Sequence, residues 1–394
     1  MFLILRSIIL KFSGIFLSYI LNILIIRWTD NSVAGGFFAF VATLSVIGAV
    51  MFGGLSKYLV RELASQSISP PQSLRLIKKV LILISISFGI IYYLLRLEVF
   101  NLSFNPIVLF LTLPLITVIS LISSYLRGIG SHIWGNLEGP ILRPIIAIIL
   151  LGSFASYFSL NEAILRWIYF ASCIFGLIFL LIRLNNTPYA HVNSTAEKFL
   201  IKKSSILYLT LFSTCEAALL NLDIILVDFI LGPEVSTELK IIYLFKNILM
   251  LPLITSNMLL PQLLAAKVDV MIFKKFIKYS IISISLVLSI VILIFGEQIS
   301  YDIFGVYVSG LSFLIFPYVI MSLIIAITGP TLETVIAHKK EKTIILFSVF
   351  AVISSVPLYI IFLPTYGLIL MCFVNAGIVS AQYIFSSIRL NHVS

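Results

Sequence analysis

Long apolar runs separated by short polar segments fill the whole of this 394-residue sequence. Hydrophobic residues make up 60% of the chain and charged residues only 11%, whereas a soluble domain carries about 25% charged residues. A run of about 20 apolar residues is long enough to cross a bilayer as an α-helix. The pattern therefore predicts an all-α, multi-pass membrane protein. The first run lacks a small-residue cleavage site and contains Lys11, so it is interpreted as an uncleaved span rather than a secretion signal.

The apolar runs predict about twelve transmembrane helices, six in each half of the chain. In the first half they are roughly Ser7–Ile26, Ala34–Leu55, Val80–Leu97, Pro106–Leu126, Leu142–Phe158 and Ala163–Ile182. In the second half they are roughly Ser205–Leu231, Ile241–Ala265, Ser280–Phe295, Gly310–Ala337, Thr343–Phe362 and Gly367–Ile388. We expect an N-terminal half (1–190), a polar cytoplasmic linker (191–204) and a C-terminal half (205–394) around a central cavity, a layout common among transporters.

The basic residues predict the orientation of the spans. With the N-terminus inside, the segments on the cytoplasmic side contain most of the 26 Lys and Arg residues. By the positive-inside rule, both termini should then be cytoplasmic. The net charge of +10 is divided among short loops instead of being clustered on one face of a folded domain, so nucleic-acid binding is not expected.

The seventh span is unusual because it contains three acidic residues, Glu216, Asp223 and Asp228. A carboxylate in hydrocarbon is costly unless it faces a partner or water. Glu216 and Asp223 are seven residues apart and project within about 20° of each other on a helix. Asp228 points away from them and lies close to the outer end of the span. We therefore expect Glu216 and Asp223 to share one face.

Lys246 lies in the next span, at a depth between Asp223 and Asp228, so an ion pair with one of these acids is plausible. Such a pair either joins two helices and does nothing else, or it lines a water-filled cavity and acts on a substrate or coupling ion. The same span carries further polar residues at Asn247, Thr255, Ser256 and Asn257. A lipid-facing helix has no need of them, which favours the second interpretation.

The first span has a polar stripe made of Lys11, Ser18 and Asn22, which project within about 20° of one face. Asn22 either lines a cavity or bonds to a neighbouring helix. Lys11 either joins it or anchors the span at the inner membrane surface.

The motifs of several enzyme classes are absent. The sequence contains no H-E-x-x-H, no phosphate-binding G-x-x-x-x-G-K-[ST] and no G-x-S-x-G. The four His residues are far apart, and the three Cys residues lie in apolar runs without metal-ligand spacing. We therefore expect no cofactor, no metal site and no catalytic residue, and interpret the chain as a protein that is not an enzyme.

Two segments resemble a known family. The first is NILIIRWTDNSVAGGFFAFVATLSVIGAVMFGGLSKYLVRELAS, with Gly36 at the start of a span, Gly53–Gly54 at its inner end and the basic segment Lys57–Arg61 after it. The second begins LLNLDIILVDFILGPEVSTELKIIYLFKN, with Asp223 in the span and Gly232–Pro233 in the outer turn. Both resemble the polysaccharide-repeat flippases (O-antigen translocases), from the superfamily that also holds multidrug and toxin extrusion (MATE) transporters and peptidoglycan-lipid flippases. The usual Gly-x-Tyr after the outer turn is missing here.

The resemblance implies a MATE-like fold and a function. A lipid-linked oligosaccharide on undecaprenyl diphosphate would be moved from the cytoplasmic to the periplasmic face of a bacterial inner membrane. The diphosphate favours a cationic wall, for which Lys246 is the best intramembrane candidate, while Lys11 or Arg127 could receive the head group at the inner mouth. Asp223 and Glu216 could hold Lys246 in place or carry a coupling proton or cation. The other expected cavity residues are Asn22 and Asn247. Membrane lipids, a polysaccharide polymerase and a chain-length regulator are the further partners that the resemblance implies.

Three other functions stay open at this point. A multidrug or toxin exporter of the same fold would move small cations, which prefer acidic walls. A membrane-embedded polymerase or acyltransferase is less consistent with the sequence, because polymerases of that kind typically have a large outer loop and the outer loops here are short. A purely structural membrane protein would leave the polar stripes unexplained.

Overall fold

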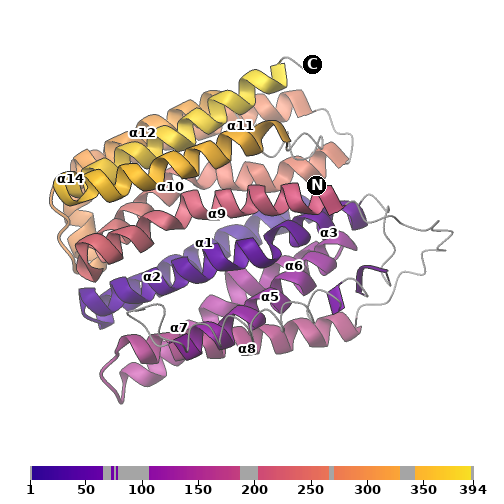
Figure 1. Ribbon diagram of the computed structural model, residues 1–394, viewed down its shortest axis with the longest axis horizontal. Coiled ribbons are helices and arrows are strands. Elements are labelled where there is room, and N and C mark those ends of the chain that lie inside the picture. Colours follow the sequence, from indigo (N-terminus) through magenta and orange to yellow (C-terminus); the bar gives the residue numbers. More distant parts are fainter. Residues whose placement is uncertain are drawn as a thin grey trace. The chain divides into compact units, whose positions relative to one another are not determined.

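The computed structural model describes residues 2–64, 72–74, 77–78, 106–186, 203–265, 270–328 and 342–391, and the elements assigned in these ranges are helices (Figure 1). Seven helical stretches within the described residues are long and apolar enough to span a membrane. They begin at Asn31, Ile107, Ile133, Glu162, Leu286, Leu311 and Ile344. The prediction of an all-α, multi-pass membrane protein is confirmed, while the count of twelve spans and the cytoplasmic termini stay predictions.

The chain divides into two compact units. Unit 1 comprises Met1–Thr29 and Phe40–Ala217, and unit 2 comprises Asp30–Ala39 and Ala218–Ser394. The helices of unit 1 are α1 (Phe2–Trp28), the second half of α2 (Asn31–Gly48), π-helix η1 (Ala49–Gly53), α3 (Gly54–Ala64), α5 (Pro106–Gly128), α6 (His132–Leu137), π-helix η2 (Glu138–Leu142), α7 (Arg143–Ala155), α8 (Glu162–Asn186) and the first half of α9 (Lys203–Leu231). Unit 2 holds the first half of α2, the rest of α9, α10 (Pro233–Ala265), α11 (Val270–Phe304), α12 (Leu311–Thr328) and α14 (Lys342–Asn391).

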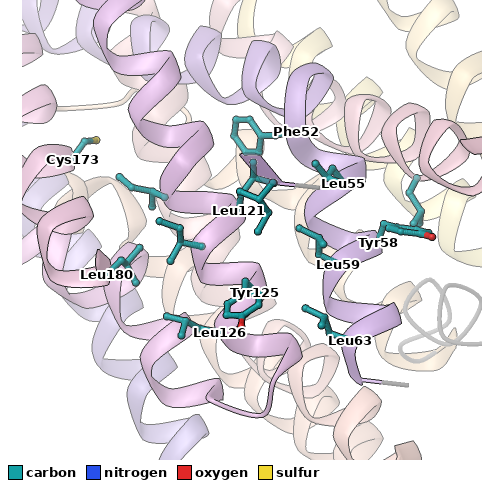
Figure 2. Close-up of a cluster of buried hydrophobic side chains, with 14 residues drawn as sticks. Phe52, Leu55, Tyr58, Leu59, Leu63, Leu121, Tyr125, Leu126, Cys173 and Leu180 are labelled. Carbon is teal, nitrogen blue, oxygen red and sulfur yellow. The ribbon is translucent and has the colours of Figure 1, made fainter. Parts of the chain in front are cut away.

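A buried apolar cluster holds α3, α5 and α8 of unit 1 together (Figure 2). Leu55, Leu59 and Leu63 recur every four residues on α3, so they lie on one face of the helix. Figure 2 shows that face directed at Leu121 and its neighbours on α5. Lipid tails are as apolar as Leu, so close van der Waals packing between these side chains holds the helices together. This cluster fixes α3, and with it the basic residues that α3 carries.

In unit 2, α10 packs against α11 and α12, and α12 packs against both α11 and α14 (Figure 1). The turn from α9 into α10 takes a single residue, Gly232, whose φ of 97° lies in the left-handed region that suits glycine. Pro233 then begins α10, where its fixed φ and missing N–H are tolerated. The tight turn brings the second half of α9 back against the start of α10: the Ser236 hydroxyl donates to the Ile224 carbonyl at 3.4 Å.

Helix α14 contains the two last predicted spans, Thr343–Phe362 and Gly367–Ile388. The helix is broken at Gly367, which has φ 56° and ψ −145°. The break lies where the sequence predicts the turn between the two spans. It lets residues on either side of Gly367 contribute to one site.

Several predicted boundaries differ from the observed helices. The fifth span was expected at Leu142–Phe158, but the helical segment starts ten residues earlier because α6 and η2 continue directly into α7. The ninth was expected at Ser280–Phe295, and α11 is longer at both ends. The apolar rule detects only the hydrocarbon-length part of a helix, so polar ends are missed. The third span, Val80–Leu97, the end of the tenth beyond Thr328 and the linker apart from its last two residues lie outside the described residues.

Candidate functional site

Asp223 lies in the second half of α9, is 2% exposed and is surrounded by hydrogen-bond donors. The Tyr243 hydroxyl on α10 donates to Oδ2. Asn375 Nδ2 on α14 donates to the same oxygen at 2.5 Å. Tyr359, also on α14, hydrogen-bonds to this carboxylate as well. Three donors from two further helices therefore replace the water that a carboxylate loses on burial.

Lys246 on α10 is 6% exposed, and its charge is also compensated inside unit 2. Its Nζ donates to Asn375 Oδ1 at 2.9 Å. The ammonium also lies 4.4 Å from the centroid of the Tyr243 ring and 5.0 Å from that of Tyr318, within the range of cation–π attraction. The sequence indicated a direct ion pair between Lys246 and an acid. What the structure gives is a bridge, with Asn375 bonded to Lys246 through its oxygen and to Asp223 through its nitrogen.

We call the buried group formed by Asp223, Tyr243, Lys246, Tyr318, Tyr359 and Asn375 the Asp223 centre. Its assembly follows from helix geometry. Tyr243 and Lys246 are three residues apart on α10, so they share a face. Asn375 Nδ2 donates to the Leu219 carbonyl at 3.0 Å as well as to Asp223, one helical turn later. The Tyr243 and Tyr318 rings meet edge to face at 6.0 Å.

Glu216 has a different environment, although it lies only seven residues before Asp223 on the same helix. Its carboxylate pairs with Lys57 Nζ of α3 at 2.6 Å within unit 1. Both side chains keep considerable exposure, 42% for Glu216 and 34% for Lys57. The sequence predicted that Glu216 and Asp223 share one face of their helix. In the structure Glu216 pairs with Lys57 in unit 1, whereas Asp223 is linked through Asn375 to Lys246 in unit 2.

The approach of α3 to α9 is possible because Gly54 has no side chain. A Cβ atom at this position would collide with the backbone of Thr210 on α9. Lys57 follows Gly54 by three residues and therefore reaches Glu216, with its ammonium 4.5 Å from the Phe212 ring centroid. The Gly–Gly pair that carried the family resemblance thus has a physical role in positioning a charged side chain.

Two further basic residues of unit 1 lie near helix ends, Arg61 on α3 and Arg127 on α5. Arg61, one turn after Lys57, donates to Glu62 at 3.0 Å and to the Ser205 hydroxyl at 2.7 Å. Arg127, at the end of α5, donates to the Ser124 hydroxyl at 2.9 Å. Its Nε is buried and has no hydrogen-bond partner among the described residues.

A buried ion pair lies in unit 1, where α6 passes through η2 into α7. Glu138 is 2% exposed and accepts two bonds from Arg143 Nη2, at 2.8 and 3.0 Å. Arg143 Nη1 donates to the Tyr169 hydroxyl on α8 at 3.3 Å. Sequence reasoning missed this pair, because the predicted span starts at Leu142 and Glu138 was placed outside the spans.

Asn22 and Asn247, two other predicted site residues, do not join either buried group. Asn22 Nδ2 donates to the Ser18 carbonyl of its own helix at 2.6 Å, and Asn247 is exposed. The side chains of Lys11, Thr255, Ser256 and Asn257 lie outside the described residues. Within the described part of the chain, no group of three or more His, Cys, Asp or Glu residues could hold a metal ion.

Asn375 and three tyrosines of the Asp223 centre, Tyr243, Tyr318 and Tyr359, were not identified from the sequence. Asn375 left a signal, because it is a lone amide in the apolar run LMCFVNAGIVS. The three tyrosines left none, since aromatic residues are ordinary in membrane spans and at their ends.

Comparison with known proteins identifies the fold. No family model and no curated protein matches the sequence. Among solved structures, an outward-facing multidrug resistance MATE transporter of the MOP superfamily matches over 99% of this chain and 95% of its own, with a TM-score of 0.68 and 16% identity. The lipid II flippase MurJ in an inward closed conformation matches over 98% of this chain and 87% of its own, with a TM-score of 0.69 and 14% identity.

A third similar structure is a MOP superfamily transporter from Pyrococcus furiosus, described as having a binding pocket of reversed polarity. It matches over 98% of this chain and 95% of its own, with a TM-score of 0.66 and 14% identity. Identities this low show a shared fold and leave the substrate undetermined. The fold that the sequence resemblance implied is therefore found, and the chain has the MATE-like fold of the MOP superfamily transporters.

Proposed function

We propose that this protein is a flippase of the bacterial inner membrane that moves an undecaprenyl-diphosphate-linked oligosaccharide, an O-antigen or related repeat unit, to the periplasmic face by alternating access. Its fold is shared with a lipid II flippase and with multidrug transporters. The two sequence segments around Gly53–Gly54 and Asp223 resemble the polysaccharide-repeat flippases. The prenyl tail would stay in lipid while sugar and diphosphate cross through a hydrated path.

The observation that carries this proposal is the exposed ion pair between Lys57 and Glu216. Glu216 lies near the middle of α9, roughly 20 Å along the helix axis from either end. A charged pair at that depth would be costly if its exposed atoms faced hydrocarbon. A water-filled space beside this part of α9 removes the cost, and a transporter requires such a space.

The charge of the neighbouring residues favours an anionic substrate. Lys57 and Arg61 lie on α3 and Arg127 lies on α5, two helices of unit 1 that pack against each other. A diphosphate accepts charge-assisted hydrogen bonds from such groups. Arg127, whose Nε has no hydrogen-bond partner among the described residues, would bind the head group first. Lys57 would then bind the diphosphate in place of Glu216.

Lys246 has a narrower part in this scheme than the sequence indicated. Because it is buried by α10, α12 and α14 residues, it could contact a substrate only in another conformation. Asn22, Asn247 and Lys11 remain proposed wall residues. A coupling proton would act at Glu216 or Asp223.

The test is deletion of the gene in its native host, followed by extraction of lipid-linked oligosaccharides and staining of surface polysaccharide. We expect loss of the surface glycan, with complete repeat units held on the cytoplasmic face and normal export restored by the wild-type gene. Normal surface glycan in a strain without a second such transporter would contradict the proposal.

A multidrug exporter is the second candidate, and the exposed carboxylate of Glu216 favours it. An accessible acid is what a cationic drug would bind, and several similar structures are multidrug MATE transporters. The same deletion strain separates the two functions. Increased sensitivity to cationic drugs with unchanged surface glycan would establish the exporter.

A further inference from the structure

The Asp223 centre contains a cation of its own, the Lys246 ammonium. The groups that surround this ammonium would also suit a small metal cation. The ammonium of Lys246 is bonded to an amide oxygen and lies against two aromatic faces, with the Asp223 carboxylate on the other side of Asn375. Amide carbonyl oxygens also coordinate Na⁺ in membrane transporters, and hard cations in general prefer carbonyl and carboxylate oxygens. A carboxylate buried to this extent requires a positive charge nearby in every conformation that keeps it buried.

We propose that Lys246 is a tethered counter-ion, which occupies the position that an alkali-metal ion would otherwise take beside Asp223. The wild-type protein then binds no Na⁺ at this centre. Removal of the ammonium converts the centre into a binding site for Na⁺ or Li⁺.

The orientation of the hydrogen bonds supports the first half of this proposal. The groups bonded to Asp223 are donors, namely the Tyr243 and Tyr359 hydroxyls and Asn375 Nδ2. A metal ion needs oxygen lone pairs directed at it, and the amide oxygen that could supply one is bonded to Lys246 Nζ. With Lys246 in place, the geometry stabilises a carboxylate, and the Asn375 amide oxygen is already bonded to an ammonium instead of a metal.

The second half follows from what loss of Lys246 would leave. Asn375 Oδ1 would lose its donor, and Asp223 would keep a negative charge without a counter-charge. The faces of Tyr243 and Tyr318 would still favour a cation. Truncation to Ala also frees the volume of a four-carbon side chain, which water and a small ion can fill. Unlike a bound ion, a tethered ammonium cannot leave, so the wild-type centre cannot release Na⁺ across the membrane.

The experiment compares thermal unfolding of the purified protein in detergent in choline, potassium, sodium and lithium chloride at equal ionic strength. The wild type should unfold at the same temperature in all four salts. Lys246→Ala should unfold at a lower temperature in choline chloride and regain several degrees in NaCl or LiCl, because a ligand that binds only the folded state raises its stability.

Two control variants localise the response. Lys240→Ala, on the same helix, removes an ammonium that lies 5.1 Å from the Phe38 ring and outside the Asp223 centre. This variant should show no preference among the salts. Lys246→Ala combined with Asp223→Asn should lose the sodium response, since the carboxylate is gone.

Three outcomes would overturn the proposal. They are a folded Lys246→Ala variant indifferent to alkali-metal ions, a sodium response that persists in the double variant, and stabilisation of the wild type by NaCl over choline chloride. If Lys246→Ala cannot be purified, binding of ²²Na⁺ to the wild type decides: saturable binding that Asp223→Asn abolishes contradicts the proposal, and its absence supports it. None of these measurements involves a glycan, so their result is independent of the flippase assignment.

Discussion

Helix α9 carries two acids that differ in almost every physical respect. Asp223 is 2% exposed and held by donors from α10 and α14, while the side chain of Glu216 is 42% exposed and has Lys57 as its ion-pair partner. The exposed fraction of each carboxylate determines whether it mainly stabilises the structure or can exchange its partner. A closed, fully bonded charge contributes mainly to which structure forms, whereas an exposed pair contributes little to stability and can exchange its partner.

The largest effect on stability should follow from Asp223→Ala. This change leaves the Lys246 ammonium buried without its counter-charge, and breaking a buried pair in this way costs about 3–5 kcal/mol. We expect a strongly reduced unfolding temperature in detergent and less protein in the membrane. Asp223→Asn combined with Lys246→Met removes both charges and should recover at least half of the loss. If Asp223→Ala is as stable as the wild type, water reaches the Asp223 centre and the centre is not closed.

The buried pair in unit 1 should give the second largest effect. Glu138→Ala leaves the Arg143 guanidinium with the Tyr169 hydroxyl as its hydrogen-bond partner among the described residues, and the Arg143 side chain is 18% exposed. Because some water reaches it, we expect a loss of about 3 kcal/mol, at the lower end of the range for broken buried pairs. The measurement is again thermal unfolding in detergent.

The control for this pair is a variant with Met at both Glu138 and Arg143. Replacing a buried pair by apolar residues of similar volume is often neutral, so the double variant should unfold close to the wild-type temperature. If it is as unstable as Glu138→Ala, the loss arises from packing around η2 and not from the uncompensated charge.

Asn375→Ala should have an intermediate effect that is specific to the bridge. It removes hydrogen bonds to a carboxylate, an ammonium and a backbone carbonyl, and hydrogen bonds to charged groups contribute about 1.5–3 kcal/mol. Gln382→Ala is the matched control, because this buried amide on α14 makes one neutral bond, to Ser348 at 2.9 Å. We expect Asn375→Ala to cost about twice as much as the control in unfolding experiments. Equal losses would mean that the amide only fills space.

The sequence predicted the fold better than it predicted the site, and the reason is the range of the interactions. Apolar length is a local property, so the class of protein and most helix positions follow from it. The depth argument that placed Lys246 close to Asp223 was also local, because it used a single turn between two helices. It could not find Asn375, which bonds to Asp223 from 152 residues away.

The Glu138–Arg143 pair was missed for a different reason, since its two members are only five residues apart. A boundary rule that starts a span at the first long apolar run left Glu138 out and placed Arg143 at the very start of the span. Here Glu138 lies in η2 and Arg143 begins α7, within one continuous helical segment from α6 to α7. An acid just before a predicted span, with a base at the start of that span, is therefore worth treating as part of the helix.

The smallest effect on stability should come from Glu216→Gln, and it tests the comparison most sharply. Surface ion pairs contribute about 0–1 kcal/mol, so the unfolding temperature should change little. If water and substrate reach this pair, however, transport should fall at least tenfold in a deletion strain that depends on the variant for its surface glycan. Glu297→Gln is the control: it changes a carboxylate on α11 that is bonded to Tyr307 and Gly310 in an exposed setting, and transport should be unaffected. Loss of stability with normal transport in Glu216→Gln would reverse the assignment, making the Lys57–Glu216 pair structural and leaving Asp223 as the acid to test for transport.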